Sequence, residues 1–143
     1  MDKDPMQILL VEDQPAAVRL VQEVLKENNG YHNLYVAKDG VEAMAFLHRE
    51  GEYALAPRPD LILLDLSLPK KDGREVLAEI KADDKLKRIP VVILTVSESE
   101  EDILKSYNLQ ANCYIIKPIH LERFIQVIKS IENFWLTIVK LPA

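Results

Sequence analysis

Four short apolar segments of this chain each end in polar residues suited to phosphate or metal chemistry. These end residues are Glu12 with Asp13, then Asp65, Thr95 and Lys117. Short apolar runs bounded by turn-forming residues are typical of strands that are buried on both faces of a parallel sheet. Ligands of such sheets bind outside the carboxyl ends of the strands, so we expect these five side chains to share one crevice.

Three carboxylates in one crevice repel each other unless a cation joins them. Oxygen ligands at a partly open site suit Mg²⁺, or Mn²⁺ in its place, because Mg²⁺ keeps several waters and takes one or two protein carboxylates together with phosphate oxygens. We expect Asp13 and Asp65 to be direct ligands, with the backbone carbonyl of Ser67 as a third. Glu12 is expected to act through a water molecule.

Asp65 is also the expected nucleophile. A metal that bridges Asp65 to an incoming phosphoryl group would neutralise charge during the transfer. Lys117 would supply a second cation at the phosphate, and the Thr95 hydroxyl would donate to one of its oxygens. The pattern therefore predicts a protein that accepts a phosphoryl group on an aspartate.

The elements that would position these residues form a repeating pattern. Five predicted strands alternate with five predicted helices, which favours a parallel α/β sheet covered on both faces. We predict the flavodoxin-like strand order 2-1-3-4-5, followed by an extended last helix and a tail. The strands are expected over 7–11, 34–37, 61–64, 90–94 and 112–116, the helices from 15, 41, 73 and 97 and over about 121–134, and a surface loop over 51–59.

Composition restricts the class of protein further. The chain has 143 residues, a net charge of −5 and one cysteine, Cys113. A single domain over 1–143 accommodates this length. The acidic balance argues against nucleic-acid binding, and no apolar run reaches the roughly 20 residues of a membrane span. With no disulfide possible and no signal peptide at the start, we expect a cytoplasmic protein.

The spacing of the polar strand ends resembles that of receiver domains of two-component response regulators. Asp65 lies 52 residues after Asp13, Thr95 lies 30 residues after Asp65, and Lys117 follows 22 residues later, before a proline. The segment DLSLPKKDG, which starts at Asp65, also resembles the family's signature. The resemblance covers essentially the whole chain.

This resemblance implies Mg²⁺-dependent phosphotransfer from a phosphohistidine on a sensor histidine kinase to Asp65. It also implies a switch in which Thr95 moves toward the phosphoryl group and Tyr114 repacks, and a cis bond before Pro118. The stretches REGEYALAPRPDLILLDLSLPKKDGREVLAEIK and IENFWLTIVKLPA further resemble small cyanobacterial response regulators paired with phytochrome-type kinases. That subfamily implies light signalling and homodimers. Val96, after the switch threonine, is bulkier than is common in the family.

The last predicted helix is apolar on two sides. One stripe can pack on the sheet, and the other needs a second surface. The tail could fold back on its own domain, but we favour a symmetric homodimer through this helix, helped by the fourth helix and fifth strand. Only 25 residues follow Pro118, so we expect no output domain and signalling by protein contact or phosphorelay. The proposed dimer residues are Phe124, Val127, Ile131, Phe134 and Ile138.

Two other classes of function compete with a receiver. A phosphohydrolase of the haloacid dehalogenase type needs a second acid two residues after the nucleophile, where this chain has Ser67. A pseudo-receiver, which binds partners without phosphorylation, would not need the complete set of polar strand ends. His32, His48 and His120 lack ligand spacing and are expected to be solvated.

Overall fold

The computed structural model describes residues 5–27, 32–66, 68, 70–95, 113–116, 122, 126 and 129–130. For residues 95 and 113–116 the description covers the backbone. The predicted fourth helix lies outside the described residues. Of the predicted last helix, residues 122, 126, 129 and 130 are described, and all four are helical and exposed.

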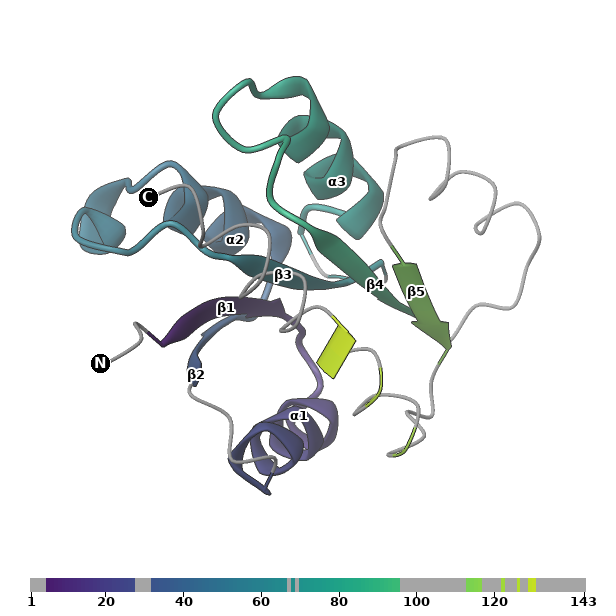
Figure 1. Cartoon of the computed structure of the whole chain (residues 1–143). Helices are drawn as coiled ribbons and strands as arrows, with labels where there is room; N and C mark the ends of the chain where they lie inside the picture. Colours follow the sequence, from purple (N-terminus) through teal and green to yellow (C-terminus); the bar gives the residue numbers. More distant parts are fainter. Residues whose placement is uncertain are drawn as a thin grey trace.

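Five parallel strands form one sheet in the order β2-β1-β3-β4-β5 (Figure 1). The flavodoxin-like order predicted from the sequence is therefore confirmed. The second strand begins two residues earlier than predicted because His32 pairs with Met6 of the first strand. The strands are β1 (Met6–Val11), β2 (His32–Ala37), β3 (Leu61–Asp65), β4 (Val91–Thr95) and β5 (Cys113–Ile116).

Three described helices cover the two faces of the sheet. Figure 1 shows α1 (Pro15–Glu27) on one face, and α2 (Gly40–Leu47) with α3 (Gly73–Ala82) on the other. Successive strand side chains point to opposite faces, so each strand contributes to two separate cores. The core on the α1 side contains Val21, Val24 and Leu25 together with alternate side chains of the strands. The other core contains residues of α2 and α3, including Phe46, Leu77 and Ile80.

The described part of α2 corrects one expectation. The roughly helical spacing of Val41, Met44, Ala45 and Leu47 predicts one apolar face, but the Val41 side chain is 55% exposed. The buried stripe instead begins at Gly40 and continues through Ala43, Met44 and Leu47, at the spacing of one helix face. Only glycine fits at position 40, where α2 comes closest to Lys71, because a Cβ there would collide with the Lys71 backbone.

The predicted loop over 51–59 begins with a short 3₁₀ helix, η1 (Gly51–Tyr53). This turn places Tyr53 against Phe46, with ring centroids 5.6 Å apart. Aromatic pairs at such distances stabilise a fold beyond the area that they bury. The start of the loop is therefore tied to α2.

The histidine predictions have mixed outcomes. The ring nitrogens of His32 have no access to solvent, so the expectation of a solvated side chain is wrong there. Its position in the paired strand β2, beside α1, explains this burial. The side chain of His48 is 41% exposed, as expected, and His120 lies outside the described residues.

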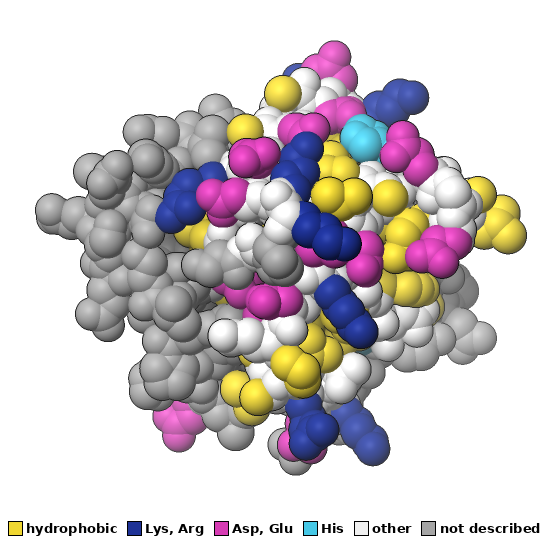
Figure 2. Space-filling view, turned by 180° about the vertical axis from the view of Figure 1, so that it is seen from behind, with side chains coloured by type: hydrophobic (Ala, Val, Ile, Leu, Met, Phe, Trp, Pro, Cys, Tyr) yellow, Lys and Arg dark blue, Asp and Glu magenta, His cyan; other side chains and the backbone are white. Residues whose placement is uncertain are grey.

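The surface of the described part is mixed in character. Figure 2 shows acidic, basic and hydrophobic side chains interspersed over the described part of one face, without a large area of a single charge. Among the described residues no helix is long and apolar enough to cross a membrane.

Candidate metal and phosphoryl site

The strand register brings two acidic residues together at the carboxyl edge of the sheet. Val11, the last residue of β1, pairs with Leu64 of β3. Glu12 and Asp65 are the next residues along these two strands. Because side chains alternate along a strand, both lie on the face of the sheet that α1 covers. The Glu12 amide donates to Ala37 O at 2.9 Å, which extends the β1–β2 hydrogen bonding by one step.

Glu12, Asp13 and Asp65 form a compact acidic cluster. One carboxylate oxygen from each residue lies within 4.8 Å of those of the other two. Glu12 is 0% exposed and Asp65 is 3% exposed, whereas Asp13 lies on the surface. Burying carboxylates costs several kcal/mol per ion, so two buried acids beside a third make a functional site with a balancing cation the natural explanation.

Local structure holds the acidic cluster in place. The Glu12 carboxylate accepts a hydrogen bond from the Gln14 amide at 3.1 Å, immediately before α1 begins. Pro15 suits the first helical position because its ring fixes φ and it lacks an amide hydrogen. The turn between β1 and α1 therefore presents Asp13 outward beside the two buried acids.

The donor set fits a small hard cation. Opposite ligands of an octahedral Mg²⁺ ion with oxygen distances of about 2.1 Å lie about 4.2 Å apart. The 4.8 Å limit of the cluster therefore allows direct ligation by two carboxylates and a water-mediated contact by the third. The predicted Mg²⁺ or Mn²⁺ site is supported by this all-oxygen arrangement.

Gly73 determines how closely α3 approaches the acidic cluster. A Cβ at Gly73 would collide with the backbone oxygen of Asp65 and lie 2.6 Å from Leu66 Cα. The Gly73 amide donates to Leu66 O at 3.1 Å, and the Leu66 amide donates to Leu94 O at 3.2 Å. The start of α3 is thus bonded directly to the end of β3. The pair Asp72-Gly73 is a turn signal in the sequence, but the sequence pattern does not indicate this close contact.

Asp39 caps α2 and also contacts Lys70, which lies between β3 and α3. Its carboxylate accepts from the Glu42 amide at 2.8 Å, as a helix N-cap, and lies 3.5 Å from the Lys70 ammonium. Lys70 adopts a left-handed backbone conformation, with φ of 65°. Asp39 was not predicted to have this role, although an aspartate before a helix start is an N-cap signal.

The remaining predicted residues are only partly placed. The backbone of Thr95 ends β4 and pairs with Ile116, while Tyr114 pairs with Ile93. Ser67 and Lys117 lie outside the described residues. So do the predicted dimer residues, namely Phe124, Val127, Ile131, Phe134 and Ile138.

Comparison with known families agrees with this geometry. Residues 8–129 match the response regulator receiver domain, and the chain belongs to this family of signalling proteins. It is 58% identical over 139 residues to the response regulator Rcp1 of Synechocystis sp., a match that covers 97% of this chain and 95% of that protein.

Two solved structures are similar over nearly the whole chain. The phosphorylated cyanobacterial phytochrome response regulator RcpA is 57% identical, with a TM-score of 0.83, and the match covers 97% of this chain and 99% of that one. The Mn²⁺-bound form of Rcp1 has the same identity and TM-score, with coverage of 97% and 100%. The prediction of a receiver that resembles phytochrome-linked regulators is confirmed.

Proposed function

We propose that this chain is a single-domain response regulator that accepts a phosphoryl group on Asp65 from a sensor histidine kinase. The observation that supports this most directly is the cluster of Glu12, Asp13 and Asp65 at the carboxyl edge of the sheet. Asp65 ends β3, so its buried carboxylate stands at the carboxyl edge of the sheet, beside the exposed Asp13. The match to a phosphorylated relative, RcpA, adds to this support.

In the proposed reaction a carboxylate oxygen of Asp65 forms a bond to phosphorus. The bond between phosphorus and the kinase's histidine nitrogen breaks, and the imidazole leaves with its electron pair and takes up a proton. Bound Mg²⁺ or Mn²⁺ supplies charge neutralisation at the phosphoryl oxygens. Asp13 and Asp65 would hold that ion directly, together with the Ser67 carbonyl, and Glu12 would hold it through water.

Thr95 and Lys117 complete the proposed site. The hydroxyl of Thr95 would donate to a phosphoryl oxygen, and the ammonium of Lys117 would offset its charge. Thr95 is the last residue of β4, a neighbour of β3 in the sheet, which favours this role. We further propose that Thr95 and Tyr114 change position together after phosphorylation.

Intact mass spectrometry tests the assignment of Asp65. Protein incubated with acetyl phosphate and Mg²⁺ should gain the mass of one phosphoryl group, and Asp65→Asn should not. Asp84→Asn is a matched control because the Asp84 side chain is 92% exposed and far along the chain from the cluster. An adduct that persists in Asp65→Asn, or that needs no divalent cation, would contradict the proposal.

The kinase partner is proposed to be of the phytochrome type, in the cytoplasm, with a role in light signalling. This rests on the similarity to Rcp1 and RcpA. A purified phytochrome-type histidine kinase, phosphorylated in advance with labelled ATP, should transfer label to this chain faster than an unrelated sensor kinase. Equal transfer from both kinases would argue against the pairing.

The output is proposed to pass through protein contacts or a phosphorelay, and through a homodimer. Rcp1 is matched over 95% of its length, which favours a receiver without an output domain. In the described sheet β5 lies at an edge, and an edge strand can pair with a second copy. The phosphohydrolase alternative is not favoured, because Ser67 stands where such an enzyme needs its second acid.

A further inference from the structure

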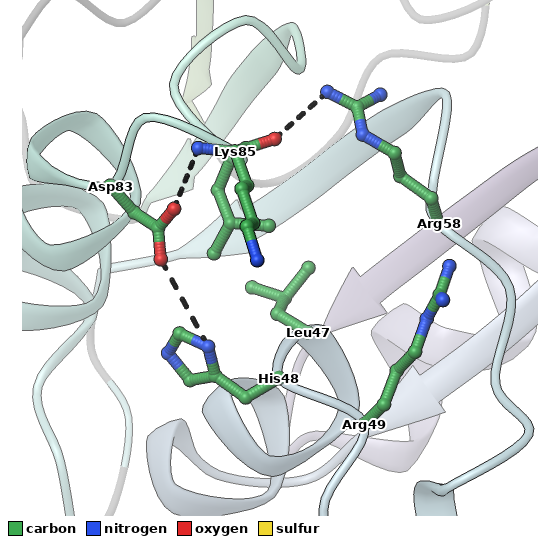
Figure 3. Close-up of a pocket in the computed structure, with 7 residues that line it drawn as sticks. Leu47, His48, Arg49, Arg58, Asp83 and Lys85 are labelled. Atoms are coloured by element: carbon green, nitrogen blue, oxygen red, sulfur yellow. Dashed lines mark hydrogen bonds and ion pairs between the residues drawn. The ribbon is translucent and has the colours of Figure 1, made fainter.

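A cavity lies at the opposite edge of the sheet from the acidic cluster. Its volume is about 270 Å³, and it forms where three connections meet: the end of α2, the segment before β3 and the loop after α3. Strands run from this edge toward the acidic cluster, so the two sites are separated by the length of the sheet. Figure 3 shows its lining: Leu47, His48, Arg49, Arg58, Asp83, Lys85 and Leu86.

The polar lining of the cavity is strongly cationic. Arg49, Arg58 and Lys85 carry three positive charges, and His48 lies beside them in the lining. Asp83 is the one acid in the lining, and it already accepts from the Lys85 amide at 2.7 Å and lies 4.0 Å from His48. Among the described residues neither Arg49 nor Lys85 has a salt bridge.

Arg49 occupies a backbone position that normally favours glycine. Its φ is 56°, in the left-handed region, directly after the C-cap of α2. The Glu50 amide donates to Ala45 O at 2.9 Å and the Arg49 amide to Phe46 O at 3.2 Å, which is the Schellman pattern of helix termination. An arginine here is conformationally unfavourable, and its side chain points along the cavity in Figure 3. The unfavourable position suggests a role for the side chain.

Arg58 is held in an orientation that lines the cavity. Its guanidinium donates to Lys85 O at 3.1 Å, which bridges the segment before β3 to the loop after α3. Leu47 and Leu86 are buried core residues that also form the apolar part of the lining. Guanidinium groups recognise phosphate and carboxylate oxygens by paired hydrogen bonds, and a concave site favours a small molecule over an extended chain.

We propose that this cavity, hereafter the basic cavity, binds a small phosphate-bearing organic anion whose flat or apolar body rests on Leu47 and Leu86. Arg49 and Arg58 bind the phosphate oxygens, and Lys85 adds charge. The site is independent of the proposed phosphoryl chemistry at Asp65. Its ligand is bound without being transformed.

The test is a titration of the full chain with AMP, followed by backbone NMR and calorimetry, in the presence of EDTA. Removing divalent cations keeps phosphate away from the acidic cluster. AMP should shift the amides of Arg49, Arg58 and Lys85, while adenosine, which lacks the phosphate, should not. Citrate in place of AMP separates a phosphate site from a carboxylate site, and tighter binding of citrate would overturn the phosphate assignment.

Two variants test the residues. Arg49→Gly and Arg58→Gln should each weaken AMP binding by roughly tenfold or more, because each removes a charge-assisted contact. Arg49→Gly should leave the denaturation midpoint unchanged or higher, since glycine suits the left-handed position. Arg19→Gln, an exposed substitution on α1, is the matched control and should bind AMP as the parent does. Equal weakening in all three variants, or shifts at the acidic cluster alone, would overturn the proposal.

Discussion

At the acidic cluster, the chemistry depends on the separation of three side chains. Glu12 and Asp65 are buried, and Asp13 completes the cluster from the surface. The three carboxylates repel each other unless a bound cation offsets their negative charge. Each of them therefore makes the other two better ligands for a divalent ion.

Asp13→Asn is expected to remove most of the stabilisation that Mg²⁺ gives to the folded protein. Thermal denaturation with and without millimolar Mg²⁺ measures it: a ligand present at 100 times its Kd stabilises the fold by about 2.7 kcal/mol. Asp13 is exposed, so the substitution should leave the metal-free protein folded. Asp84→Asn should keep the full Mg²⁺ response. An unchanged response in Asp13→Asn would show that Asp13 is not a ligand.

Gly73 contributes by having no side chain. Gly73→Ala should lower the free energy of unfolding by about 1–3 kcal/mol, because the new Cβ must displace the backbone at Asp65 and Leu66. Phosphorylation by acetyl phosphate should slow as well, since the acceptor itself is displaced. Chemical denaturation and intact mass spectrometry measure the two effects.

Gly51→Ala is the control for Gly73→Ala. Position 51 also favours glycine, but for a different reason, because its backbone φ is 57°. No atom lies within 4 Å of a Cβ built there. It should cost about 1 kcal/mol of stability and leave the rate of phosphorylation unchanged. Equal phosphorylation in both variants would contradict the importance of the contact between α3 and β3.

Among the elements, the sheet was the most predictable part. Apolar runs identified all five strands, and their alternation with helices predicted the order that the structure has. The sequence could not predict contacts between connections that are distant along the chain. Asp39 with Lys70, Gly73 with Asp65, and the basic cavity all depend on how loops meet after folding. Hydrophobic periodicity does not indicate which loops come into contact.

The N-cap of α2 gives a prediction at the scale of elements. Asp39→Ala should lower the free energy of unfolding by about 1–2 kcal/mol, because the Glu42 amide loses its acceptor. Asp39→Asn should cost less than about 1 kcal/mol, since it keeps an acceptor and loses only the pair with the largely exposed Lys70. Urea denaturation compares the two, and equal losses would show that the cap is not the main contribution.

Across the whole molecule, the two edges of the sheet differ in charge. The carboxyl edge carries the acidic cluster, and the amino edge carries the basic cavity. α2 and α3 run between these edges, with their starts near the phosphoryl site and their ends at the basic cavity.

The proposed homodimer needs an apolar stripe on the last helix, and this requirement can be tested. Ile131→Glu places a charge in that stripe, and burying an unpaired charge is costly, so the dimer should dissociate to monomers. Gln126→Glu introduces the same charge at an exposed position of the same segment and should leave the dimer intact. Light scattering over a dilution series measures both. A parent protein with a monomer mass at every concentration would contradict the dimer, and dissociation by both variants would place the effect in net charge instead of the apolar stripe.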